Sequence, residues 1–167
     1  MYFNVEMMGM ALLFNSEGKT PKFPKEIVDN FHTIGNMIKK CSSFLEIGGP
    51  TRTYIYCDHH SLKNLIVIND NPTSNMSFTK GIEQVIKMDG RNTLFKDKVF
   101  DCILASCLPS DVRSDIIKEI GRIGTDKCLV LWQGNREEDE ISFNLMGFKR
   151  INSNAQDWAV NYYREQK

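Results

Sequence analysis

The chain has 167 residues, the length of one ordinary domain, and is long enough to bury a hydrophobic core. Hydrophobic residues make up 41% and charged residues 25%, as in a soluble globular protein, and the formal net charge of zero gives no electrostatic footprint for nucleic acid. The five cysteines include no CxxC pair, so neither a disulfide framework nor a thiolate metal site is predicted. We expect a single domain over residues 1–167 with no bound metal and no nucleic-acid partner.

The N-terminal segment contains an apolar run at residues 7–14, with no basic residues before it and too short to span a bilayer. We therefore expect a cytoplasmic protein with no membrane partner. A loop composition over residues 16–25 leads into a predicted helix at residues 25–40, where apolar residues recur at steps of four and three. Residues 1–42 are expected to pack on the core or to cover a ligand crevice.

The stretch FLEIGGPTR, residues 44–52, predicts a buried strand that ends in a tight turn at Gly48 and Gly49. Glycines at such a turn let the backbone approach a ligand, and open α/β sheets bind nucleotides at the carboxyl ends of their strands. A plain turn is the alternative interpretation, because glycine serves any tight turn.

Four further apolar runs follow, and each is separated from the next by a loop or a helical pattern. Their sequences are LIVIND (residues 65–70), VIKMD (85–89), VFDCILA (99–105) and CLVLW (128–132). The first two of these runs end in the acids Asp70 and Asp89. We expect Asp70 to be a buried acid that closes an apolar strand and therefore needs a polar partner.

The remaining elements are two helices and two strands. Apolar residues at steps of three and four predict a helix from Ser110, which can cap its start, to Gly124, which ends it. Residues 135–146 predict a second helix with an acidic first turn and with Ile141 and Leu145 buried. Strands are predicted at residues 148–151 and 158–164.

This order of elements resembles the class I S-adenosylmethionine-dependent methyltransferases, from about residue 44 to the C-terminus. The resemblance implies an α/β, Rossmann-like fold with a mostly parallel sheet of seven strands, an antiparallel last strand and helices on both faces. It implies S-adenosylmethionine as the cofactor and methyl transfer to a small-molecule acceptor as the function. The cofactor-binding positions that it implies are Glu46, Gly48, Gly49, Asp70, Asn71, Asp89, Gly90, Ala105 and Ser106.

Within this resemblance, the three acids would hydrogen-bond the cofactor rather than act as acids or bases. Glu46 would bind near the amino-acid part, Asp70 the ribose hydroxyls and Asp89 the adenine. Most of the acceleration of methyl transfer can come from holding the acceptor, the methyl group and the sulfur in line. The candidate catalytic residues are His59 and His60, because an imidazole near a carboxylate can accept a proton from an acceptor hydroxyl. A solvated surface loop is the alternative interpretation of this pair.

Three features leave another function open. Pro50 and Arg52 stand where the family's turn usually carries glycine, and residues 53–64 lack the amphipathic pattern of the usual first crossover helix. Pro50 also has no N–H for a pyrophosphate, which disfavours a nicotinamide dinucleotide. The alternative to an active methyltransferase is a catalytically inactive, methyltransferase-like binding module.

Overall fold

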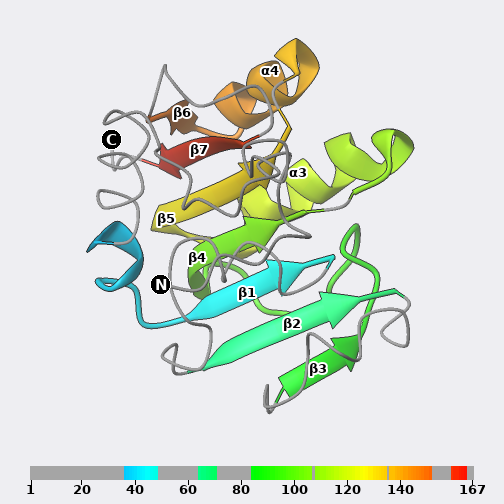
Figure 1. Cartoon of the computed structure of the whole chain (residues 1–167), viewed down its shortest axis with the longest axis vertical. Helices are drawn as coiled ribbons and strands as arrows, with labels where there is room; N and C mark the ends of the chain where they lie inside the picture. The colour runs from blue at the N-terminus through cyan, green and yellow to red at the C-terminus, as the bar shows by residue number, and fades with distance from the viewer. Residues whose placement is uncertain are drawn as a thin grey trace, which may run out of the picture.

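Seven strands form one sheet in the order β3-β2-β1-β4-β5-β7-β6 (Figure 1). The computed structural model describes residues 36–48, 64–70, 84–106, 108–134, 136–151 and 159–164. The strands are β1 (Phe44–Ile47), β2 (Leu65–Asn69), β3 (Gln84–Lys87), β4 (Phe100–Ala105), β5 (Gly124–Gln133), β6 (Phe148–Arg150) and β7 (Ala159–Arg164).

The direction of the strands follows the prediction. The pairs formed among β1 to β5 are all parallel, whereas β7 is antiparallel to both β5 and β6. All four residues of β1 are buried, as expected for a parallel strand covered on both faces. The predicted mostly parallel sheet with an antiparallel last strand is therefore confirmed.

The order of the strands reverses at β1. The chain proceeds from β1 to β2 and β3 on one side, and then returns to β4 and β5 on the other side. The carboxyl ends of β1 and β4 therefore form the switch point of the sheet, which is where open α/β sheets bind their ligands.

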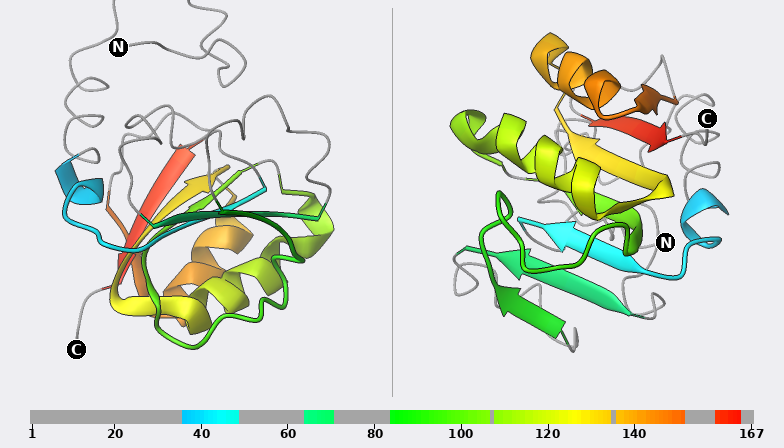
Figure 2. Two further views of the ribbon diagram at one scale, coloured as in Figure 1. Left: turned by 90° about the horizontal axis from the view of Figure 1, so that it is seen from below. Right: turned by 180° about the vertical axis from the view of Figure 1, so that it is seen from behind.

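Two helices, α3 (Arg113–Ile123) and α4 (Glu137–Leu145), lie on the same face of the sheet (Figure 2). A 3-10 turn, η5 (Ser110–Val112), precedes α3. The predicted cap at Ser110 is wrong, because Pro109 occupies the N-cap position of η5 and the Ser110 hydroxyl instead accepts a hydrogen bond from Arg136 at 3.1 Å. No helix among the described residues is long and apolar enough to cross a membrane.

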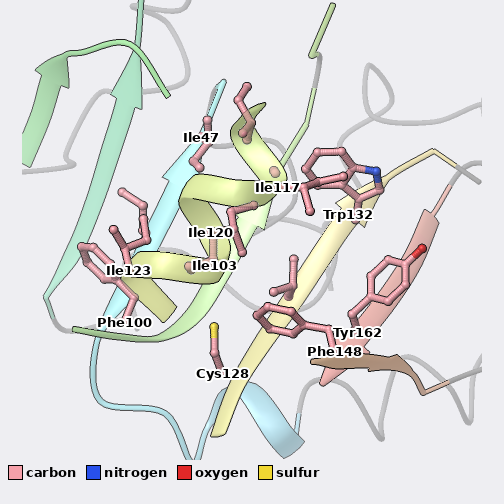
Figure 3. Close-up of a cluster of buried hydrophobic side chains, with 14 of the residues drawn as sticks. Ile47, Phe100, Ile103, Ile117, Ile120, Ile123, Cys128, Trp132, Phe148 and Tyr162 are labelled. Carbon is pink, nitrogen blue, oxygen red and sulfur yellow. The ribbon is translucent and has the colours of Figure 1, made fainter. Parts of the chain in front are cut away.

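The core between the sheet and these helices contains the predicted apolar face of α3 (Figure 3). The helix buries Ile116, Ile117, Ile120 and Ile123. On the opposite face of the sheet, Ile38 is buried in a second cluster with Phe44 and Leu65. Ile38 ends a helical segment at residues 36–38, and the earlier part of the predicted helix at residues 25–40 lies outside the described residues.

Helix α4 differs from its prediction, because Ile141 and Leu145 are 53% and 77% exposed. The buried residues of the helix are Asp139 and Phe143, which are four positions apart and so share a face. Phe143 stacks on Tyr162, with the ring centroids 4.1 Å apart. The buried face therefore contains an acid, which an apolar pattern does not identify.

Replacement of Leu145 by alanine is expected to change the free energy of unfolding by less than about 0.5 kcal/mol, as for most surface positions. The same substitution at a buried leucine would lower the free energy of unfolding by about 2–5 kcal/mol. Urea denaturation followed by circular dichroism measures the difference, and a loss in the range for buried leucine would contradict the exposed position of this side chain.

Candidate functional site

The carboxyl ends of β1, β2 and β4 are joined by backbone hydrogen bonds. The Gly48 N–H donates to the Ile68 carbonyl oxygen at 3.0 Å, and the Ser106 N–H donates to the Ile47 carbonyl oxygen at 3.1 Å. The residue pairs Ile47–Ile68 and Ile47–Ala105 lie in register at this edge. The turns that carry several of the predicted site residues therefore leave the sheet side by side.

Gly48 has a backbone conformation and a position that only glycine fits. Its φ is +92°, which lies in the left-handed region that favours glycine. A Cβ atom at this position would lie 2.1 Å from the backbone carbonyl oxygen of Ser106. The chain therefore passes over the switch point without a side chain, in close contact with the end of β4.

Asp70 follows β2 and is exposed, so the expectation of a buried acid is wrong. The polar residue at the buried end of this strand is instead Asn69, which is 9% exposed. Its side-chain amide donates a hydrogen bond to the Gly48 carbonyl oxygen at 2.8 Å. Asn69 was not predicted from the sequence, although an amide that ends an apolar run is a usable signal. Asn69 holds the turn, and the carboxylate of Asp70 lies in solvent beside it.

Glu46 lies inside β1, two residues before the glycine turn, and is fully buried. Side chains alternate across a strand, so Glu46 faces the same side as Phe44, away from α3. It pairs in register with Val67 and Leu104, which are buried on that face. The structure therefore places Glu46 within the sheet rather than at its open edge.

Asp89 and Gly90 follow β3 and lie close to the end of β1. A Cβ at Gly90 would lie 2.8 Å from the Cγ2 atom of Ile47, so this turn packs directly on β1. The Asp89 carboxylate accepts hydrogen bonds from the Arg91 side chain at 2.7 and 3.0 Å and from its backbone N–H at 2.9 Å. The hydrogen bonds from the Arg91 side chain and backbone lower the pKa of Asp89, so the carboxylate is charged at neutral pH.

Ala105 and Ser106, at the end of β4, are 0% and 1% exposed. Their side chains are buried, and the backbone of Ser106 contacts Gly48 at this edge. Four predicted positions, Gly49, Asn71, His59 and His60, lie outside the described residues and remain predictions. The predicted residues at or beside the ends of adjacent strands are thus Gly48, Asp70, Asp89, Gly90, Ala105 and Ser106.

A buried ion pair lies beyond this edge, at the carboxyl end of β5. The side chains of Arg113 and Asp139 are 8% and 6% exposed, and the Arg113 Nε lies 3.0 Å from the Asp139 Oδ2. The indole N–H of Trp132 donates to the same oxygen at 2.9 Å, and the guanidinium donates to the Gln133 carbonyl oxygen at 2.7 Å. Because Arg113 begins α3 and Asp139 lies in the first turn of α4, this group connects both helices to β5.

Comparisons with known proteins find matches in structure. No protein-family model matches the chain, and a search of curated proteins by sequence finds none either. An S-adenosylmethionine-dependent methyltransferase from Archaeoglobus fulgidus superposes with a TM-score of 0.62 at 15% identity, over 84% of this chain and 95% of that one. A TehB-like S-adenosylmethionine-dependent methyltransferase from Corynebacterium glutamicum gives 0.54 at 11%, over 84% and 95%.

A third similar structure contains a ligand. The N-methyltransferase NodS from Bradyrhizobium japonicum, in complex with S-adenosylhomocysteine, gives a TM-score of 0.57 at 12% identity, over 92% of this chain and 95% of that one. Because the sequence identities are this low, the comparisons establish the fold of the chain and nothing finer.

Proposed function

We propose that this chain, whose fold is that of the class I S-adenosylmethionine-dependent methyltransferases, binds S-adenosylmethionine and transfers its methyl group to a small-molecule acceptor. The observation that carries the proposal is the position of Gly48 at the switch point of the sheet. Because of its positive φ and its contact with Ser106, only glycine fits here, so no side chain covers the backbone at the point where open α/β sheets bind ligands.

The residues around Gly48 fit the parts of this cofactor. The exposed Asp70 carboxylate offers two acceptor oxygens, which suits the two hydroxyls of a ribose. The turn at Asp89 and Gly90, one strand further along the sheet, would lie on the adenine side. The bare backbone at Gly48 would lie below the amino-acid part, with Asn69 holding its carbonyl oxygen in place.

When bound, S-adenosylmethionine supplies a methyl group that is already activated by a positively charged sulfur. The work left to the chain is to hold the acceptor and the cofactor in a reactive arrangement. The hydrogen bonds that join β1, β2 and β4 fix the floor of the site. The ion pair of Arg113 with Asp139 fixes the neighbouring end of β5, which we assign to the acceptor side.

A thermal-shift measurement tests the proposal, because a ligand that binds only the folded state raises the melting temperature by mass action. We expect S-adenosylmethionine and S-adenosylhomocysteine to raise the melting temperature and NAD to leave it unchanged. No shift with either adenosyl ligand at millimolar concentration would contradict the proposal. Binding without methyl transfer to any tested amine, thiol or hydroxyl acceptor would indicate a binding module instead.

Replacement of Asp70 by alanine is expected to weaken S-adenosylhomocysteine binding by about 1.5–3 kcal/mol, the range for a lost hydrogen bond to a charged group. This corresponds to a rise of about 10- to 150-fold in the dissociation constant. Isothermal titration calorimetry measures it, with Glu138→Ala as the control because Glu138 is an exposed acid on α4. An unchanged dissociation constant in folded Asp70→Ala would place the ribose elsewhere.

A further inference from the structure

The loop between β3 and β4, which carries Asp89 and Gly90, is bound to α3 through the side chain of Glu119. The Oε1 atom of Glu119 accepts hydrogen bonds from the Thr93 backbone N–H at 2.8 Å and from the Thr93 hydroxyl. Thr93 is 4% exposed and Glu119 is 7% exposed, so these contacts are shielded from water. A buried carboxylate with this set of donors fixes the backbone of the loop at Thr93.

Arg122, one turn further along α3, binds both Glu119 and the loop. Its Nε donates to the Glu119 Oε2 at 2.9 Å, and its Nη1 donates to the Phe95 carbonyl oxygen at 2.8 Å. Its Nη2 donates to the Thr93 carbonyl oxygen at 3.2 Å, and its Nη1 also pairs with Asp97 at 2.6 Å. The loop is therefore paired with one face of α3 at three alternate residues, Thr93, Phe95 and Asp97.

The start of the same loop is held by packing. A Cβ added at Gly90 would lie 2.8 Å from Ile47 on β1 and 3.6 Å from Ile116 on α3. Helix α3 thus contacts the loop at Gly90 and again at Thr93. The position of Asp89 relative to the glycine turn of β1 depends on both contacts.

Glu119 is charged when it makes these contacts. Its burial raises the pKa of the carboxyl group, but hydrogen bonds from Arg122 and Thr93 outweigh burial and hold the pKa below its ordinary value. At neutral pH the carboxylate is therefore an acceptor for every donor around it.

We propose that Glu119 and Arg122 are positioning residues for cofactor binding, which hold Asp89 and Gly90 in their binding arrangement before the ligand arrives. The inference rests on the proposed function and deepens it. Ordering a loop during binding costs free energy, so a loop that is already ordered retains more of the affinity of its contacts. Neither side chain needs to touch the cofactor for this effect.

The test compares Glu119→Gln with Asp115→Asn by isothermal titration of S-adenosylhomocysteine. Glutamine keeps an oxygen acceptor for Thr93 but removes the charge that Arg122 binds. Asp115 forms an ion pair at the same three-residue spacing, with Lys118 on the exposed side of α3. We expect the dissociation constant to rise by about tenfold or more in Glu119→Gln and to stay unchanged in Asp115→Asn.

Two further measurements separate positioning from a general loss of stability. Hydrogen exchange of the free protein should be faster at the backbone amides of residues 90–98 in Glu119→Gln, with the slow exchange restored by S-adenosylhomocysteine. Val130→Ala, a core substitution in β5, should lower the melting temperature without changing the dissociation constant.

The possible results distinguish the two proposals. A wild type that binds S-adenosylhomocysteine together with a folded Glu119→Gln of unchanged affinity would overturn the positioning role alone. A weakened affinity in Val130→Ala equal to that in Glu119→Gln would also overturn it. A wild type that does not bind the ligand would overturn the proposed function and this inference together.

Discussion

Replacement of Asp139 by alanine is expected to lower the free energy of unfolding by about 3–5 kcal/mol, the cost of leaving a buried charge without its partner. The substitution leaves the guanidinium of Arg113 buried at the end of β5 without its counter-charge. It also removes the acceptor of the Trp132 indole N–H. Urea denaturation measured by circular dichroism gives the loss.

The matched control for this variant is Glu138→Ala, which removes an exposed acid from the same helical turn. Its expected effect is within about 0.5 kcal/mol. Asp139→Asn should lie between the two, because the amide oxygen still accepts hydrogen bonds from Arg113 and Trp132. A loss below about 1 kcal/mol in Asp139→Ala would mean that water reaches the arginine, contrary to its burial.

The second large effect is expected at the glycine turn, where Gly48→Ala should abolish the thermal shift caused by S-adenosylhomocysteine. The added Cβ would lie 2.1 Å from the Ser106 carbonyl oxygen, so the ends of β1 and β4 would have to move apart. The positive φ adds a strain of about 1–3 kcal/mol for a residue other than glycine.

Gly147→Ala is the control that separates strain from contact. Gly147 also has a positive φ, of +81°, but a Cβ there would meet no described atom within 4 Å. This variant should therefore lose some stability and keep its full response to the ligand. If Gly48→Ala remains folded and binds S-adenosylhomocysteine as the wild type does, the cofactor does not depend on this turn.

The sheet was predictable because buried parallel strands are nearly continuous apolar runs, such as Leu65–Asn69 in β2. The apolar face of α3 was predictable from its three- and four-residue steps. The start of β5 at Gly124 could not be predicted, because polar residues follow it and the ladder with β4 is irregular after the Phe100–Gly124 pair. The buried face of α4 was missed because its acid is compensated by an arginine from another helix.

The candidate site also contains residues that the sequence predicts and residues that it does not. Gly48 was predictable because a glycine after a buried strand is a local signal. The pairs Thr93–Glu119 and Arg113–Asp139 each join residues 26 positions apart, so only the folded chain brings their charges and donors together. Local patterns report burial and turns, whereas the partner of a buried charge depends on how α3 and α4 pack.

The most direct test of the cofactor site is an amide chemical-shift titration of the isotope-labelled chain with S-adenosylhomocysteine. We expect saturable shifts concentrated at backbone amides at and beside the carboxyl ends of adjacent strands, those of Gly48, Asp70, Gly90 and Ser106 among them. No saturable shifts, or shifts confined to residues away from this edge, such as those of α4, would contradict it.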